Sequence, residues 1–140
     1  LGIVLRDLGK LKEAELSYRK AIEIKPDYAV AHYNLGIILR DLGKLKEAEL
    51  SYQKAIAIKP DFADAYSNLG NILIDLGNLQ EAKVSISKAI QIKPEHNEAI
   101  GEMGRIMTLQ GNYKEGLQKL KEGYGSIIFD HSNQEMRINS

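Results

Sequence analysis

An internal repeat is the feature of this sequence that most constrains its fold. Residues 1–28 return almost unchanged as residues 35–62, an offset of 34 residues, and looser copies begin at Leu69 and Met103. The two closest copies differ only at the pairs Val4/Ile38, Arg19/Gln53, Glu23/Ala57 and Tyr28/Phe62. Glycines recur with the same offset at positions 2, 36, 70 and 104 and at 9, 43, 77 and 111, and prolines at 26, 60 and 94. Self-similarity at such a period is typical of arrays that stack one supersecondary unit on the next.

The pattern of apolar residues predicts two helices in each copy, because these residues recur at steps of three and four on both sides of a central glycine. In the second copy we expect a first helix at 27–41, with the side chain of Asp27 capping its free amides. Gly43 should end this helix, because the left-handed conformation at a helix end has the lowest energetic cost in a residue without a Cβ atom. A second helix should follow at 45–58, where Pro60 terminates it.

Small residues predict where the two helices approach each other closely. Gly36, Ala48 and Ala55 occupy such positions, and larger neighbours such as Tyr52 fill the space around them. The fourth copy carries Gly116 and Gly123 where the others have alanine. Because a glycine inside a helix costs about 0.5–1 kcal/mol relative to alanine, we expect the last helix to be the least stable.

The order of these residue classes resembles the tetratricopeptide repeat family. In the second copy it reads Asn34-Leu35-Gly36, Ala48, Tyr52, Ala55 and Pro60. The resemblance covers residues 1 to about 124. The array is similar to those of bacterial members of the family and to the repeat region of O-GlcNAc transferases. It implies an all-α fold, an alpha-alpha superhelix (solenoid) of about three and a half helical hairpins.

The resemblance also divides the chain into units. We expect a truncated repeat at 1–28, made of the end of a first helix and a second helix, complete repeats at 29–62 and 63–96, and a degenerate terminal repeat at 97–124. Residues 125–140 would be a tail or a junction to a further domain, β-prone at 125–130 and polar and aperiodic beyond. Because the sequence begins without a methionine, we expect a piece of a longer protein.

Within such a superhelix the resemblance implies a peptide-binding groove lined by the first helices. The expected groove residues are Tyr33, Asn34, Ile37, Arg40, Asp41, Asp64, Ser67, Asn68, Asn71, Asp75, Glu102 and Arg105. Asn34 and Asn68 are of most interest, because an amide can both donate to and accept from an extended backbone. The alternative is that they are solvated polar residues on an exposed helix face.

The charges in this groove suggest what it does not bind. The carboxylate clamp known in this family needs lysines where this chain carries Tyr33, Ser67 and Gly101, so we expect no binding of a chaperone C-terminus. Several acidic residues beside a few arginines suggest a ligand with some basic character instead.

Composition argues against several other classes of function. The chain has 19 basic and 19 acidic residues and no cysteine, so we expect no nucleic-acid partner and no thiol chemistry. No apolar run is long enough for a membrane span, so we expect a soluble, cytoplasmic chain. His32, His96 and His131 share no ligand spacing, and the glycines form no phosphate-binding loop. We therefore expect no catalytic residues, no metal and no cofactor.

Three functional classes stay open at this stage. The first is a scaffold that binds peptide or protein partners through the groove. The second is a substrate-recruiting segment of a larger enzyme such as a glycosyltransferase. The third is a spacer or self-assembly element. In the truncated unit several apolar side chains should lack the complete first helix that covers their equivalents in the next unit: Leu5, Leu8, Leu11 and Tyr18. We therefore expect an apolar N-terminal end that packs against a partner or another copy.

Overall fold

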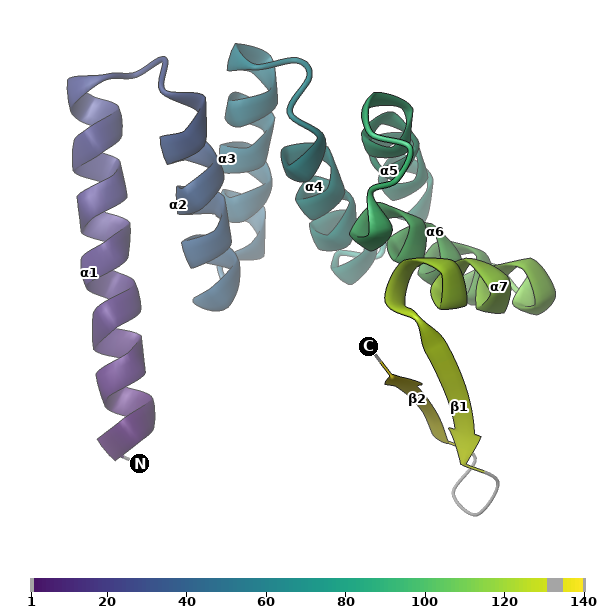
Figure 1. Cartoon of the computed structure of the whole chain (residues 1–140). Helices are drawn as coiled ribbons and strands as arrows, with labels where there is room; N and C mark the ends of the chain where they lie inside the picture. The colour runs from purple at the N-terminus through teal and green to yellow at the C-terminus, as the bar shows by residue number, and fades with distance from the viewer. Residues whose placement is uncertain (1, 131–134, 140) are drawn as a thin grey trace.

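The computed structural model describes residues 2–130 and 135–139, and side chains between residues 7 and 125. Seven helices follow one another in this part of the chain: α1 (Gly2–Ile24), α2 (Ala29–Asp41), α3 (Leu45–Ile58), α4 (Ala63–Asp75), α5 (Leu79–Ile92), α6 (Asn97–Leu109) and α7 (Tyr113–Tyr124). Figure 1 shows them as an open row that runs from α1 on the left to α7 on the right. The predicted alpha-alpha superhelix of helical hairpins is confirmed.

Hairpins form because each central glycine closes its first helix in the same way. Gly43 has φ +78°, and its amide donates to the Arg40 carbonyl at 2.9 Å. The next amide, that of Lys44, donates to the Leu39 carbonyl at 2.8 Å. This Schellman arrangement satisfies carbonyls that the helix end leaves free. Gly77 and Gly111, at φ +83° and +89°, repeat it after α4 and α6.

The helix starts differ from the expectation. Asp27 does not cap α2, because Lys25 to Tyr28 form a tight turn that closes with a 3.2 Å bond from the Tyr28 amide to the Lys25 carbonyl. Asp27 lies inside this turn, and Tyr28 takes the cap position without a side-chain bond. His32 lies over the same turn, where its Nε2 donates to the Pro26 carbonyl at 2.8 Å.

The first unit also differs from the expectation. Residues 1–28 were predicted to contain a helix break at Gly9, but α1 is one continuous helix from Gly2 to Ile24. The segment before Gly9 spans only about two helical turns, so folding it back would bury little apolar surface. Keeping Gly9 inside a helix costs only about 1 kcal/mol.

The core lies between consecutive helices from α2 to α6. Tyr52, Leu39, Ile72, Ile86 and Ile106 are its largest fully buried side chains. Gly36 lies directly against the Tyr52 ring, and an added Cβ there would meet that ring at 2.6 Å. The close approach predicted from the small residues is therefore present, with a large side chain of one helix filling the space that glycine leaves on the other.

The fourth hairpin corrects the interpretation of its glycines. A Cβ atom added at Gly123 would collide with the backbone of Gly101 and Asn97, and one added at Gly104 would lie 2.6 Å from the Leu120 nitrogen. A Cβ atom added at Gly116 would lie 2.8 Å from the Thr108 nitrogen. Here backbone packs on backbone, so Gly116 and Gly123 allow the closest helix pair and do not simply weaken α7.

The C-terminal segment forms two strands, β1 (Ser126–Asp130) and β2 (Glu135–Asn139), below α7 in Figure 1. They pair antiparallel, with Ile128 opposite Arg137. The stretch predicted to be β-prone is thus a strand. The expectation of an aperiodic tail is wrong for residues 135–139, because β1 offers them a pairing partner. His131 lies outside the described residues.

Candidate functional site

Three first helices and the end of α7 enclose a polar hollow of about 380 Å³. We call it the inner hollow. Its lining consists of Tyr33, Arg40, Ser67, Asn68, Asn71, Glu98, Glu102 and Tyr124. It exists because the 34-residue offset places the same face of α2, α4 and α6 side by side.

Many of the predicted groove residues meet in or beside this hollow. Tyr33, Arg40, Ser67, Asn68, Asn71 and Glu102 line it directly. Asp41 contacts the lining residue Arg40 at 3.4 Å, and Asp75 contacts Arg105, which lies beside the hollow, at 3.6 Å. Asn34 and Ile37 do not line it: Asn34 is half-buried, and Ile37 packs against the core. Of the two asparagines of most interest in the sequence, only Asn68 thus reaches the hollow.

Hydrogen bonds fix the side chains in the middle of the hollow. The Asn68 amide nitrogen donates to the Tyr33 hydroxyl at 3.2 Å, so the Asn68 carbonyl stays available to a ligand. Tyr52 lies beside Tyr33, with ring centroids 6.0 Å apart, and its hydroxyl is buried without a hydrogen-bond partner among the described residues. Burial raises the pKa of Tyr52 to about 12, because the charged phenolate would be desolvated. Burial and the charge of Asp64 likewise raise the pKa of Tyr33.

Glu102 is the most enclosed acid of the site, at 6% exposed. Its carboxylate accepts from the Tyr124 hydroxyl at 2.5 Å and from Arg105 at 2.9 Å. Arg105 also contacts Asn71 at 3.4 Å. Burial and the bond to Glu102 raise the pKa of Tyr124 well above its usual range. Glu102 therefore organises the α6 end of the hollow and is already satisfied by its own neighbours.

Glu98 and Asp64 supply the more accessible negative charge. Glu98 lines the hollow, is exposed, and has no ion-pair partner among the described side chains. Asp64 lies in an adjacent shallow depression, where His96 Nε2 donates to it at 2.7 Å. The other nitrogen of His96 accepts from the Ala99 amide at 3.2 Å and caps α6. His96 therefore joins α4 to α6 as a structural residue.

Tyr124 lines the inner hollow, although the sequence reasoning did not point to it. Its ring packs directly on Gly101, where an added Cβ would collide with the ring. Gly101 stands one repeat after Ser67 and two after Tyr33. The glycine on the first helix leaves a space, and the aromatic ring at the end of the second helix fills it. That pair of departures from the repeat could have indicated the contact.

The described residues hold no group of three or more histidine, aspartate or glutamate side chains placed to bind a metal ion. Among the same residues, no helix has the length and apolar character needed to cross a bilayer. The inner hollow offers amide, hydroxyl and carboxylate groups, which suit hydrogen bonding and ion pairing with another polypeptide.

Comparison with known proteins assigns the repeats. A family model described as TPR repeat matches residues 2–39 and 36–77, and one described as tetratricopeptide repeat matches residues 63–96. A search of curated proteins finds no match.

Solved structures show the same fold. A crystal structure of MamA aligns with TM-score 0.75 and 28% identity, over 88% of this chain and 72% of that one. MamA from Desulfovibrio magneticus RS-1 aligns with TM-score 0.73 and 23% identity, over 86% of this chain and 68% of that one. A mutant O-GlcNAc transferase from Thermobaculum terrenum aligns with TM-score 0.67 and 24% identity, over 71% of this chain and 19% of that one.

Proposed function

Because the chain belongs to the tetratricopeptide repeat family, whose members are protein-interaction scaffolds, we propose that its inner hollow binds an extended segment of a partner protein. The observation that carries this proposal is the convergence of polar side chains from α2, α4, α6 and α7 on one concave site. We infer that the segment works by binding and has no catalytic role of its own.

The chemistry of the hollow favours a basic side chain in the ligand. Glu98 is free to pair with a lysine or arginine, and Asp64 adds charge beside it. The Asn68 carbonyl can accept from the ligand's backbone amides. Both arginines are already held by carboxylates of the same face, so a ligand carboxylate would meet little unpaired positive charge.

Selection from a displayed library of random peptides tests this proposal. We expect the enriched peptides to carry a lysine or arginine, and a double variant Asn68→Ala, Glu98→Gln to bind them at least ten-fold more weakly. Lys20→Ala, on the exposed outer side of α1, is the matched control and should bind like the wild type. Equal binding by the double variant and the wild type would refute the inner hollow as the binding site.

The α1 surface favours a second candidate, self-association. Ala14, Tyr18 and Ala21 are partly exposed, whereas their equivalents Ala48, Tyr52 and Ala55 are fully buried beneath α2. Leu8 is 37% exposed on the same helix, while the side chain of Leu5 lies outside the described residues. A particle mass that rises with concentration in sedimentation would support this, and a constant monomer mass would exclude it. Substrate recruitment within a larger enzyme stays a prediction, because the likeness to the transferase shows the fold alone.

A further inference from the structure

Three exposed apolar side chains stand at the same position of α1, α3 and α5. Leu16, Leu50 and Val84 follow one another at the 34-residue offset and are 68%, 58% and 72% exposed. We call them the outer row. The inner hollow is lined by side chains of α2, α4, α6 and α7, so the outer row lies outside it. Covering three large apolar side chains that are exposed in register would be favourable.

Lysines stand one helical turn before and after these apolar residues, on the same helix faces. Two lysines flank Leu16, two flank Leu50 and one follows Val84, and all are exposed: Lys12, Lys20, Lys46, Lys54 and Lys88. The fourth copy ends the pattern, because it has Gln118 in place of Val84 and Glu122 in place of Lys88. The outer row is therefore apolar in its middle and bordered by positive charge.

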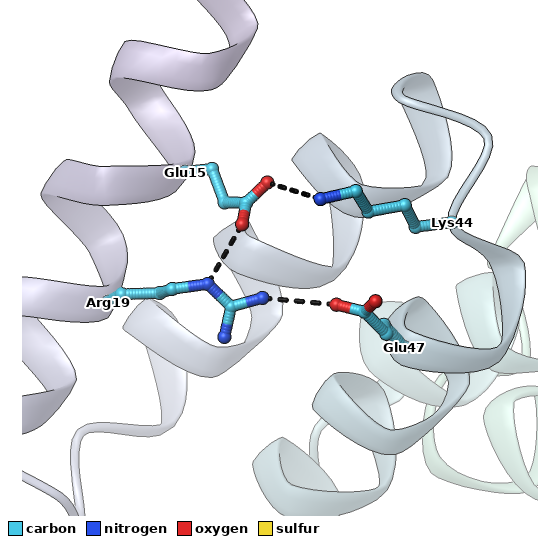
Figure 2. A network of polar contacts seen from close by, with 4 residues as sticks. All are labelled: Glu15, Arg19, Lys44 and Glu47. Carbon is cyan, nitrogen blue, oxygen red and sulfur yellow. Dashed lines mark hydrogen bonds and ion pairs between the residues drawn. The ribbon is translucent and has the colours of Figure 1, made fainter.

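The acidic residues at the junction of α1 and α3 are already paired, as Figure 2 shows. Glu47 accepts a hydrogen bond from Arg19 at 3.1 Å. Glu15 accepts from Arg19 at 2.9 Å and from Lys44 at 3.2 Å. Two cations thus balance two carboxylates here, and this network leaves the charge of the flanking lysines unchanged.

An excess of positive charge therefore remains beside the outer row. Lys46 contacts Glu49 at 3.5 Å, which is a surface contact of little energetic value. The other flanking lysines, and Lys83 next to Val84, have no ion-pair partner among the described side chains. The acidic residues of this surface that also lack such a partner are fewer: Glu13, Glu23 and Glu81.

Two apolar recesses open beside the outer row. One lies between α1 and α3, has a volume of about 400 Å³ and includes Leu50 in its lining. The other lies between α3 and α5, has a volume of about 790 Å³ and includes Val84. Buried leucines of α2 and α4 form their floors: Leu35, Leu39, Leu69 and Leu73. A projecting apolar side chain of a partner can reach these floors.

We propose that the outer row binds a partner segment that combines acidic and apolar side chains. Its carboxylates pair with the flanking lysines, and its apolar side chains enter the recesses beside Leu50 and Val84. A polypeptide fits better than an anionic bilayer, because it can place carboxylates at the lysines alone, whereas a uniformly anionic surface would also meet Glu13 and Glu81. This surface prefers acid where the inner hollow prefers base, and it does not depend on that hollow.

The peptide acetyl-Glu-Leu-Glu-Glu-Leu-Leu-Glu-amide is the probe, and NMR methyl shifts of the 140-residue chain are the readout. We expect saturable shifts at Leu50, Leu73 and Val84. The same peptide with glutamine at each glutamate keeps its size and its apolar residues without the charge, and it should bind about ten-fold more weakly. A version with lysine at these positions should give no saturable shift.

Charge-reversed variants of the protein test the lysines. The double variant Lys54→Glu, Lys88→Glu should bind the acidic peptide about ten-fold more weakly, because two attractive charges become repulsive. The matched control is Lys10→Glu, Lys93→Glu, which makes the same change of charge at exposed lysines that do not flank the row. This control should bind like the wild type, and so should Glu98→Gln in the inner hollow.

The apolar part of the surface needs its own variant. Leu50→Ser, Val84→Ser removes two exposed side chains of the row, so it should weaken peptide binding about five-fold with little effect on folding. Far-ultraviolet circular dichroism of each variant checks that the helices are retained.

The proposal is overturned if the acidic peptide gives no saturable shift at the outer row, if the glutamine peptide binds equally well, or if both row variants bind like the control. Shifts confined to the lining of the inner hollow would also overturn it. Sedimentation with phosphatidylserine vesicles tests the other occupant. A chain that sediments with these vesicles but does not bind the peptide would assign the row to a lipid surface and refute the proposed partner.

Discussion

Tyr52 shows how a single residue serves both the packing and the polar site of this repeat. Its ring fills the space left by Gly36, and its hydroxyl lies without a hydrogen-bond partner among the described residues, beneath the inner hollow. A buried hydroxyl without a partner costs about 1–3 kcal/mol of desolvation. The ring therefore stabilises the hairpin while the hydroxyl opposes it.

Replacing Tyr52 with phenylalanine should raise the free energy of unfolding by about 1 kcal/mol, because the ring is kept and the unpaired hydroxyl is removed. Urea denaturation at pH 7 measures the difference. Tyr18→Phe is the matched control in the first unit, where the side chain is only partly buried, and it should change stability little. A clear loss of stability in Tyr52→Phe would mean that the hydroxyl has a partner in solution.

The raised pKa of Tyr52 predicts how stability depends on pH. Its folded pKa of about 12 lies above the ordinary tyrosine pKa of about 10, so the unfolded chain loses this proton first as pH rises. The protonated tyrosine therefore stabilises the fold fully below pH 10, and this contribution is lost on the order of 2 kcal/mol between pH 10 and 12. Unfolding measured at pH 8 and pH 11 should show a steeper loss in the wild type than in Tyr52→Phe.

Gly36 should tolerate alanine poorly. The new methyl would lie 2.6 Å from the Tyr52 ring, which is enclosed and has nowhere to move, so we expect a loss of about 1–3 kcal/mol in denaturation. Gly9→Ala is the opposite control, because nothing lies within 4 Å of its Cβ position. Inside a continuous helix that change should stabilise by about 0.5–1 kcal/mol. Equal effects at the two glycines would contradict the packing described here.

At the scale of helices, the sequence predicted the helix ends that are determined by local residues such as glycine and proline. The bounds of α3 are those expected, because Gly43 and Pro60 act on the backbone directly. It could not predict that α1 is continuous. The conformation at Gly9 depends on the packing of residues 2–8 and not on local helix propensity alone. It also misjudged Gly123, because a glycine that weakens an isolated helix can be required where two backbones meet.

Gly123→Ala should therefore destabilise the α6/α7 hairpin, although alanine is the better helix former. The added methyl would collide with the backbone of Gly101, and backbone cannot give way as a flexible side chain can. Hydrogen exchange should show lost protection in α6 and α7. Gln118→Ala, on the exposed side of α7, should leave that protection intact. A Gly123→Ala chain more protected than the wild type would restore the interpretation of Gly123 as a weak point.

At the scale of the whole molecule, the candidate site was predictable where it follows the repeat and unpredictable where it departs from it. Asn68, Asn71 and Arg40 were found from their place in the repeat and line the inner hollow. Tyr124 could not be found in this way, because it comes from a second helix and fills a gap at Gly101.

In a linear array the effect of a destabilising substitution should depend on its position, because each helix contacts only the helices one or two places away along the row. Ile72 lies fully buried in α4, at the centre of the core, so Ile72→Ala should cost about 2–5 kcal/mol and lower hydrogen-exchange protection on both sides of it, in α3 as well as α5. Gly123→Ala, at the end of the row, should spare α2 and α3. If both variants lowered protection uniformly from α2 to α7, the chain would unfold as one cooperative unit, and the dependence on position expected of a linear array would be contradicted.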